Sequence, residues 1–526
     1  MKDFAPALPG AYQNAGETAP LLTPAAHNAS APSLRLAPRR QTPVPVDRAL
    51  PRVCIVGAGA SGLALAKTLY EAGVPFDCFD TSERVGGLWA FKNKSGKSAA
   101  YRSLHANTSR DRTSYSDFPF PRDWPNFPHH TQLAQYFEAY ADWFGFRHRI
   151  ELNRTVERAR QDEDGVWEVT LDGGETRRYD ALCVASGQFW NPAWPDPRPP
   201  GRFAGLELHS KDYVDPTEPA DLRGKRVLVV GFGNSALDIA CELGRKENCE
   251  MAYISTRRGR WVIPRQFGAR VWDAYYPHPA LESAESSRRS LRTIARSLAP
   301  RRLREWIRLW RLESAHGLPH QHGLPQPDEP YFSAWPVISS ELYQRISAGD
   351  LAVKPDIASY DGRIVNFTDG STAEVDAIVY CTGYTRIFPF FEQPFAQRPQ
   401  DSTSLWMQIV DPDRPNLAFV GFTNPGCAVM PMSEQQAIFV RDMLLGRFSP
   451  PSSQQMRQEL SEVRAQMEKG AAFPRWYAEN IDCAAYVAAL RRVARERRAR
   501  NDGAIPAIRN RPGSAAPAAD AEVGAA

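Results

Sequence analysis

The sequence lacks two features that would suggest particular classes of partner. It has no uninterrupted apolar run near the roughly 20 residues that a membrane-spanning helix needs. It also lacks a large charge excess, because 64 Lys and Arg residues against 60 Asp and Glu residues give a formal net charge of +4 in 526 residues. A nearly balanced chain does not have the polycationic character typical of nucleic-acid binding. We therefore expect neither a transmembrane segment nor a nucleic-acid partner.

Paired cysteines are also missing. The eight cysteines contain no C-x-x-C pair, and several lie inside apolar runs such as 53–56. We expect buried thiols in a reducing compartment rather than a disulfide framework or a metal site. No continuous apolar segment follows Lys2, so a secretion signal is not expected. The predicted location is cytoplasmic.

Proline, in contrast, is abundant. The 44 prolines make up about 8% of the chain, against a usual value near 5%. Eight of them lie between Pro6 and Pro45, and three more lie after residue 500 in a second stretch rich in Ala, Pro and Gly. These compositions predict disordered ends. Between them, short β-branched runs alternate with helical patterns, which indicates an α/β fold with parallel sheets.

A dinucleotide-binding fingerprint begins at residue 52. An apolar run of strand length, 52–56, precedes a G-x-G-x-x-G turn and a helical pattern that starts at residue 63. This order lets the turn approach a pyrophosphate while the helix N-terminus faces the phosphates. An acid ends the next predicted strand, at the spacing where a carboxylate receives a ribose hydroxyl. The predicted nucleotide-binding residues are Gly57, Ala58, Gly59, Ala60, Ser61, Gly62 and Asp80.

A second fingerprint follows the apolar run 226–230, with Ala in the third glycine place. After its second predicted strand, where an NAD site has a carboxylate, two arginines follow a Ser-Thr pair. Because a guanidinium binds a 2′-phosphate in a bidentate manner, these arginines favour NADPH over NADH. The alternative is a surface pair at a strand end. The predicted NADPH-binding residues are Gly231, Gly233, Asn234, Ser235, Ala236, Ser255, Thr256, Arg257 and Arg258.

The two units together indicate a redox enzyme. The first ends in an acid and the second in arginines, which favours FAD in the first and NADPH in the second, with hydride passing from nicotinamide to flavin. No C-x₄-C redox pair follows the first fingerprint, so a disulfide reductase is disfavoured. The electrons would then pass to oxygen or to a partner protein.

Residues 203–213 fit the pattern F-x-G-x-x-x-H-x-x-x-Y through Phe203, Gly205, His209 and Tyr213. In this feature the sequence resembles the flavin-containing monooxygenases, class B flavoprotein monooxygenases for which the pattern is the identifying sequence. The further matches span roughly residues 50 to 450 and are Gly86–Trp89, Asn107–Ser109, Ser116–Pro119, Gly233–Ser235, Asp238–Ala240, Ser255–Gly259 and Asp376–Tyr384. The resemblance implies two Rossmann-like dinucleotide-binding domains, with the NADPH domain inserted in the FAD domain.

The resemblance also implies a reaction. NADPH reduces FAD, O₂ adds at the flavin C4a atom, and the resulting hydroperoxide transfers one oxygen atom to a nucleophilic nitrogen or sulfur of a small molecule, as in an N,N-dimethylaniline monooxygenase. Relatives that perform Baeyer–Villiger oxidation of ketones usually carry Trp at the place of Tyr213, which disfavours that alternative. A reductase that passes electrons to a protein partner is the third alternative.

The resemblance assigns roles to single residues. Asn107 is the predicted catalytic residue, since an amide both donates and accepts and so could hold NADP⁺ or the peroxyflavin; the alternative is a loop Asn that bonds local backbone. His209 and Tyr213 are expected to organise the linker rather than to transfer protons. Leu88 and Trp89 are expected to contact the flavin, unless they only pack in the core. The remaining residues implied to bind cofactor are Gly87, Thr108, Asp238, Thr382 and Gly383.

The segment from about 270 to 335 is the least similar to the family. Within it Leu303, Trp306, Ile307 and Trp310 fall at i, i+3, i+4 and i+7, with five arginines interleaved, which predicts a basic amphipathic helix. We expect it to pack on the NADPH domain; a lid, a dimer contact and a membrane-surface helix are the alternatives. Homo-oligomerisation and the substrate are left open.

The predicted organisation has six parts. They are a disordered leader over 1–50, an FAD-binding first segment over 51–215, an NADPH-binding domain over 216–335, an FAD-binding second segment over 336–450, C-terminal helices over 451–500 and a disordered tail over 501–526.

Overall fold

The structure is a computed structural model that describes residues 43–274, 301–331, 335–392, 404–470, 480–481 and 483–498. The tail predicted over 501–526 lies outside the described residues, and so does the leader predicted over 1–50 up to residue 42. Residues 43–50 are described and contact the folded chain, since the Asp47 amide donates to the Gly73 carbonyl at 2.9 Å. The folded part therefore begins before the predicted boundary.

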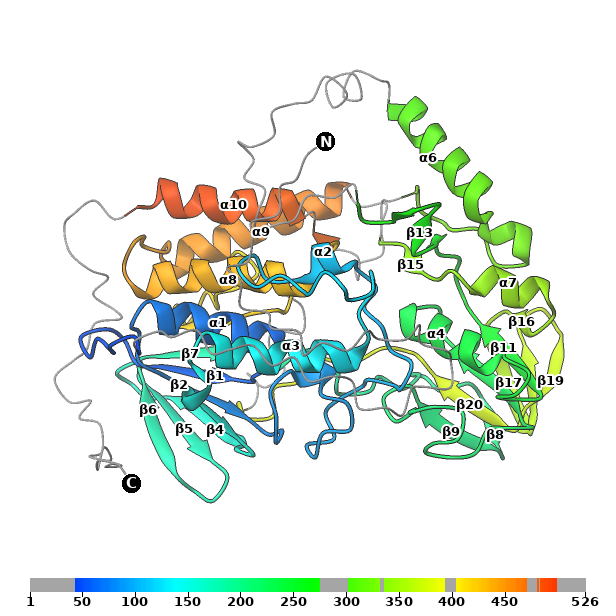
Figure 1. The fold of residues 1–526 in the computed structure, drawn as a ribbon, viewed down its shortest axis with the longest axis horizontal. Coiled ribbons are helices and arrows are strands. Elements are labelled where there is room, and N and C mark those ends of the chain that lie inside the picture. The colour runs from blue at the N-terminus through cyan, green and yellow to red at the C-terminus, as the bar shows by residue number, and fades with distance from the viewer. Residues whose placement is uncertain are drawn as a thin grey trace.

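A first parallel sheet has five strands in the order β21-β7-β1-β2-β3 (Figure 1). The central strand β1 is buried along its whole length, as its apolar sequence predicts. Helix α1 packs against α8, and α10 packs on α8 from the far side. The bounds are β1 Val53–Val56, β2 Phe76–Asp80, β3 Ile150–Leu152, β7 Ala181–Val184, β21 Leu417–Phe419, α1 Ala60–Glu71, α8 Val429–Leu444 and α10 Cys483–Glu496.

A second parallel sheet has five strands in the order β16-β11-β10-β20-β9. Its β10 lies between β11 and β20, just as β1 lies between β2 and β7 in the first sheet. Helix α4 follows β10 and contacts β10 and β11. The bounds are β9 Leu206–His209, β10 Arg226–Val230, β11 Met251–Ser255, β16 Leu351–Lys354, β20 Ala377–Tyr380 and α4 Asn234–Leu243.

The two sheets confirm the predicted pair of Rossmann-like units and the insertion of the second into the first. The strands of the first sheet come from 53–184 and 417–419, and those of the second from between them. The second sheet is wider than the predicted range 216–335, because it includes strands at 206–209 and 351–380. An apolar strand does not carry in its own sequence the identity of the sheet that it joins.

Smaller elements complete the fold. An antiparallel sheet β4-β5-β6 lies beside the first unit, and a mixed sheet β19-β18-β17-β8 lies beside the second. The bounds are η2 Gly87–Trp89, α2 Arg110–Thr113, α3 His130–Trp143, η3 Arg147–Arg149, β4 Val156–Gln161, β5 Trp167–Leu171, β6 Thr176–Tyr179, β8 Gly201–Phe203, β12 Val262–Ile263, β13 Gln266–Phe267, β14 Arg270–Val271, α6 Arg301–His316, η4 Pro319–His322, β15 Val337–Ile338, α7 Leu342–Ser347, β17 Ile357–Gly362, β18 Ile364–Phe367, β19 Thr372–Glu374, β22 Asn424–Pro425, α9 Ser453–Gly470 and β23 Asn480–Ile481.

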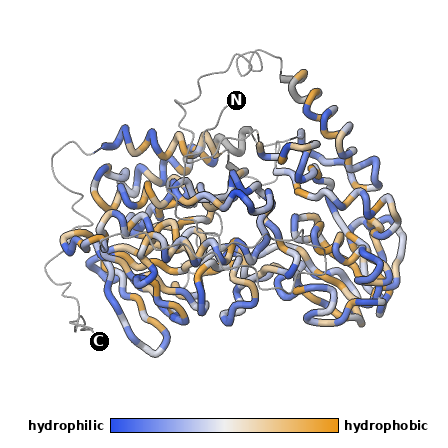
Figure 2. The backbone as a smooth tube through the Cα atoms, viewed as in Figure 1, coloured by the Kyte–Doolittle hydropathy of each residue, from blue (hydrophilic) through white to orange (hydrophobic). Residues whose placement is uncertain are grey.

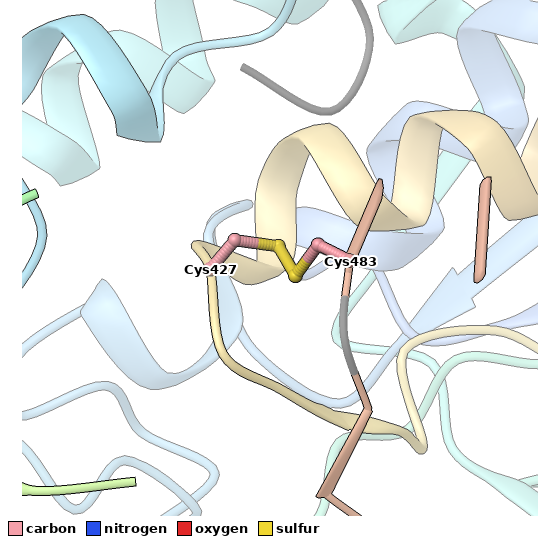
Figure 3. The surroundings of a disulfide bond; sticks show 2 residues. All are labelled: Cys427 and Cys483. Carbon is pink, nitrogen blue, oxygen red and sulfur yellow. A yellow bond between two sulfur atoms is a disulfide. The ribbon is translucent and has the colours of Figure 1, made fainter. Parts of the chain in front are cut away.

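The prediction that all eight cysteines are thiols is wrong for one pair. Cys427, just before α8, forms a disulfide with Cys483, the first residue of α10 (Figure 3). The two are 56 residues apart and meet because α10 packs on α8, which their spacing could not reveal. The cysteine argument for a reducing compartment loses part of its basis.

The other six cysteines are free, and all but the half-buried Cys381 are buried, as predicted. Burial raises the pKa of the Cys183 thiol to about 12, so this thiol stays protonated. Among the described residues, no helix is long and apolar enough to cross a bilayer. No cluster of His, Cys, Asp or Glu in that part of the chain has the grouping of a metal site.

Candidate cofactor and active site

The first glycine turn leaves no room for side chains. Gly57 has φ +105°, and a Cβ there would lie 2.5 Å from the Ala185 carbonyl oxygen at the end of β7. A Cβ on Gly62 would overlap the Gly57 carbonyl oxygen. The turn therefore needs glycine at both positions to pass so close to β7 and to α1. This bare backbone at a helix N-terminus fits a pyrophosphate.

The Gly86–Trp89 segment covers the first turn. A Cβ on Gly59 would lie 3.5 Å from the Gly87 Cα atom, and Gly87 has φ +55°. The short helix η2 thus lies beside the turn, with Leu88 and Trp89 half-buried. Trp89 also packs against the core of the first unit. Both roles predicted for Trp89, flavin contact and core packing, remain compatible with this position.

Asp80 lies at the carboxyl end of β2, as predicted, and bonds the turn directly. Its carboxylate accepts from the Ala58 amide at 2.6 Å and from the Ser82 amide at 2.8 Å. Burial raises the pKa of Asp80, and the two amide donors oppose that effect. The carboxylate therefore holds the glycine turn in place, and its lone pairs leave capacity for a ribose hydroxyl.

The second glycine turn has the same place after its strand as the first, but fewer neighbouring atoms surround its second glycine. Gly231 has φ +122°, and a Cβ there would lie 2.5 Å from the Cys381 carbonyl oxygen, after β20. A Cβ on Gly233 would meet no described heavy atom within 4 Å. The Asn234 side chain accepts from the Ile338 amide at 2.8 Å and so bonds β15. The backbone around Gly233 is left open to a ligand.

The segment after β11 presents two exposed arginines. The Ser255 hydroxyl donates to the Pro355 carbonyl at 2.6 Å, and the Thr256 hydroxyl donates to the Arg258 carbonyl at 2.7 Å. These bonds shape the loop. Arg257 and Arg258 are exposed, and within the described part of the chain neither guanidinium takes part in a hydrogen bond or an ion pair. Their donors are available to an anion such as a 2′-phosphate.

Asn107 is held by residues from the other unit. Its side-chain oxygen accepts from Arg265 Nη2 at 3.3 Å, and its carbonyl accepts from Trp272 Nε1 at 2.7 Å. Two residues on, the Ser109 amide donates to the buried Asp273 carboxylate at 2.6 Å. The excursion after β12 therefore positions the Asn107 segment from the side of the second unit.

A buried chain of polar contacts continues from Arg265 to α4. Arg265 Nη2 lies 3.5 Å from Asp238 Oδ1, and the Tyr101 hydroxyl donates to Asp238 Oδ2 at 2.7 Å. The pKa of Asp238 is raised above its usual value, because the effect of burial exceeds the opposing effect of the nearby Arg265 guanidinium. Asp238 stays a predicted cofactor-binding residue, and its carboxylate contacts Tyr101 and Arg265. Arg265 was missed because no motif marks it, although a charge two residues after the apolar pair 262–263 was a signal.

The linker motif lies between the units. The Tyr213 hydroxyl donates to Glu242 of α4 at 2.8 Å, one turn beyond the carboxylate that Tyr101 contacts. His209 is fully buried between the rings of Trp194 and Tyr384, with ring centroids 5.6 and 5.4 Å away. Burial lowers the pKa of His209 and favours its neutral form. These contacts support the predicted role in organising the linker.

The other two residues of the motif sit at the edge of the second unit. Phe203 packs on Tyr360 with ring centroids 5.8 Å apart, and a Cβ on Gly205 would overlap the Asp376 carbonyl oxygen. Gly205 is thus required for a close approach of β9 to β20.

The last predicted cofactor residues follow a strand of the second sheet. Thr382 and Gly383 follow β20, a strand of the second sheet, and bond the Ala193 backbone. They adjoin the second turn, since Gly231 faces the preceding Cys381 carbonyl. The Thr108 hydroxyl bonds the Thr113 hydroxyl at 2.8 Å, close behind Asn107.

Known proteins resemble this chain over most of its length. A family model described as flavin-binding monooxygenase-like matches residues 50–503. The flavin-containing monooxygenase 5 of Oryctolagus cuniculus is 33% identical over 436 residues, which are 80% of this chain and 78% of that protein. The N-oxide-forming dimethylaniline monooxygenase 2 of Cavia porcellus is 33% identical over 78% of this chain and 76% of its own.

Solved structures share the fold. The S-allyl-L-cysteine S-oxygenase from Allium sativum has a TM-score of 0.60 at 22% identity and covers 85% of this chain and 89% of its own. A steroid monooxygenase bound to NADP has a TM-score of 0.58 at 18% identity and covers 85% of this chain and 98% of its own.

Proposed function

The chain belongs to the flavin-binding monooxygenase-like family, and we propose that this flavin-dependent monooxygenase uses NADPH to transfer one atom of O₂ to a nucleophilic nitrogen or sulfur of a small molecule. The observation that carries the proposal is the position of Asn107. This amide belongs to the first nucleotide-binding unit, but Arg265 and Trp272 of the second unit hold it. A group that must contact both cofactors would be expected at such a junction.

The cofactors are FAD and NADPH, and we assign FAD to the first unit. The glycine turn that Asp80 bonds fits a resident dinucleotide, since its backbone is bare and its carboxylate is near the expected ribose. NADPH goes to the second unit, where Arg257 and Arg258 are free to contact a 2′-phosphate. When bound, the flavin supplies the chemistry that activates O₂ and transfers oxygen.

The protein's own residues position and shield the reacting groups. The Asn107 oxygen accepts from Arg265, and its NH₂ group has no hydrogen-bond partner among the described residues. The NH₂ group can therefore donate to a bound cofactor without supplying a labile proton. Arg265 is oriented by the half-buried Asp238, and Asp238 by Tyr101. In this scheme Asn107 touches the cofactor, and the other three residues are positioning residues.

Oxygenation of nitrogen or sulfur is favoured over ketone oxidation by Tyr213. In the family that the sequence resembles, the Baeyer–Villiger enzymes usually carry Trp at this place. Here the phenol hydroxyl donates to the half-buried Glu242 carboxylate. The names of two relatives, a dimethylaniline monooxygenase and an S-oxygenase, agree with this choice.

The test is product analysis under ¹⁸O₂. The FAD-loaded enzyme with NADPH is given N,N-dimethylaniline, an alkyl aryl sulfide and a cyclic ketone in separate reactions. One ¹⁸O atom on nitrogen or sulfur is the expected result. A labelled lactone as the main product would replace the proposal with Baeyer–Villiger oxidation, and NADPH consumption that reduces a protein acceptor without labelled product would replace it with a reductase.

A further inference from the structure

Helix α6 presents two apolar faces, of which only one is packed. Leu312 is fully buried in a cluster with Trp261, Trp272 and Tyr331, and Leu309 packs against the same cluster. Through this inner face, the C-terminal half of α6 packs on the second unit. The helix lies at the periphery of the molecule, at the upper right of Figure 1.

The amphipathic face that the sequence predicts points away from this contact. Its exposed fractions are 45% for Leu303, 61% for Trp306, 39% for Ile307 and 56% for Trp310. The helix packs on the second unit, as expected, but it does so through another face. Leu309 and Leu312 make that contact instead, and Figure 2 shows apolar segments alternating with polar ones along α6.

The exposed face forms one continuous patch. Its four side chains follow the i, i+3, i+4, i+7 spacing and therefore lie on one side of the helix over two turns. They are four of the eight large hydrophobic side chains exposed in the described part of the chain. Two tryptophans on such a face are typical of helices at a membrane–water interface, where the ring is buried and the indole N–H stays hydrated.

Charge identifies the kind of partner. The helix sequence contains five Arg and two Glu residues, so its formal charge is 5 − 2 = +3 with His neutral. Arg308 and Arg311 are exposed beside the patch, and their long stems allow the guanidinium groups to reach lipid phosphates while the rings are buried. A symmetric contact between two copies would instead place one +3 helix against another.

We propose that the α6 patch docks the enzyme on an anionic lipid bilayer. The helix lies in the plane of the headgroups, with Leu303, Trp306, Ile307 and Trp310 among the upper acyl chains. The contact is peripheral and reversible. Its strength depends on both the apolar patch and the negative charge of the lipid.

Vesicle co-sedimentation of the full-length, FAD-loaded enzyme tests the proposal. Vesicles of phosphatidylcholine alone are compared with vesicles that also contain phosphatidylglycerol, at low and high salt. The enzyme is expected to sediment with the anionic vesicles and to be released by salt. Sedimentation that is equal for both lipids, or enzyme that stays in the supernatant with anionic vesicles, would overturn the proposal.

Variants separate the patch from other parts of the surface. Trp306→Ser with Trp310→Ser should lower partitioning by about 10-fold or more, and Arg308→Gln with Arg311→Gln should lower it for anionic vesicles by about 10-fold. Val463→Ser, at an exposed apolar residue of α9, is the matched control and should bind as the parent does.

Turnover without lipid should be unchanged in all three variants. A loss of turnover in the tryptophan variant would indicate a lid instead, and a change of oligomeric mass would indicate a dimer contact; either result overturns the proposal.

Discussion

The two glycine turns share their place in the fold but not their surroundings. Each connects the central strand of a parallel sheet to a helix, and in each the first glycine lies against the end of a neighbouring strand. The first turn is enclosed, because Gly59 lies against Gly87 and Asp80 bonds the Ala58 amide. The second turn is open at Gly233.

The difference indicates two kinds of ligand. A dinucleotide on the enclosed turn is contacted on more sides and so dissociates slowly, as a resident flavin must. A dinucleotide on the open turn, where exposed arginines supply part of the binding, can exchange between turnovers. We infer that the same motif is used once for a prosthetic group and once for a cosubstrate.

The largest expected effect is that of Gly62→Ala. The added Cβ would overlap the Gly57 carbonyl oxygen, which the backbone of the turn cannot avoid without moving. We expect the displaced turn to weaken the free energy of flavin binding by about 3 kcal/mol, which corresponds to a loss of about 100-fold in flavin affinity. The flavin-to-protein absorbance ratio of the purified enzyme measures it. The mirror variant Ala236→Gly should keep its flavin, and equal flavin loss in both would contradict the difference between the turns.

The next effect concerns the open turn. Replacing both Arg257 and Arg258 with Ala removes the donors proposed for the 2′-phosphate, so the ratio of kcat/KM for NADPH to that for NADH should fall by about 10- to 100-fold. Flavin content should not change. Arg223→Ala, which removes an exposed arginine paired with Asp221, is the control and should leave the ratio unaltered. A parent enzyme that prefers NADH would refute the assignment outright.

A smaller effect is expected where the two units meet. Asn107→Ala should leave flavin bound and NADPH oxidation active, but should lower the product formed per NADPH by about 10-fold. Arg265→Ala should do the same more weakly, because it acts through the amide that it orients. The double variant should be no worse than Asn107→Ala, since the two residues act as one unit.

The control for this pair is a neighbour of Arg265. Gln266→Ala removes an exposed side chain next to Arg265 and should leave coupling unchanged. Arg265→Lys keeps the charge and should recover part of the coupling. Fully coupled turnover in Asn107→Ala, or strictly additive losses in the double variant, would rule out the proposed role.

Local sequence order was enough to predict the two Rossmann-like units. In each unit the strand, the glycine turn and the helix follow one another directly, and Asp80 ends the next strand, so the pattern contains the geometry. The turns require glycine at Gly57 and Gly231 because each passes close to the backbone at the end of a neighbouring strand, a contact that the pattern alone did not reveal.

Contacts between distant segments could not be predicted. Arg265 reaches Asn107 across 158 residues, and Cys427 reaches Cys483 across 56, and neither pairing leaves a spacing pattern. The apolar face of α6 was recognised, but its direction was not. Periodicity shows that a face exists, whereas the packing of Leu312 decides which face turns inward.

The smallest expected effect concerns Glu242, which Tyr213 contacts at the junction. Burial raises the pKa of Glu242, so the folded state holds this proton more firmly than the unfolded state does. The contribution of this proton to the free energy of unfolding is fully present below the pKa that Glu242 has in the unfolded chain. It is lost as the pH rises through the higher pKa of the folded state. Glu242→Gln cannot titrate and keeps an oxygen for the Tyr213 hydroxyl. Relative to the parent, the free energy of unfolding of this variant should therefore increase by on the order of 1 kcal/mol as the pH rises.

Thermal midpoints of the parent and Glu242→Gln, measured from about pH 4 to about pH 8, give the difference curve. Glu247→Gln, at an exposed residue in the turn after α4, is the control and should give a flat difference. A flat curve for Glu242→Gln as well would show that Glu242 titrates alike in the folded and unfolded states.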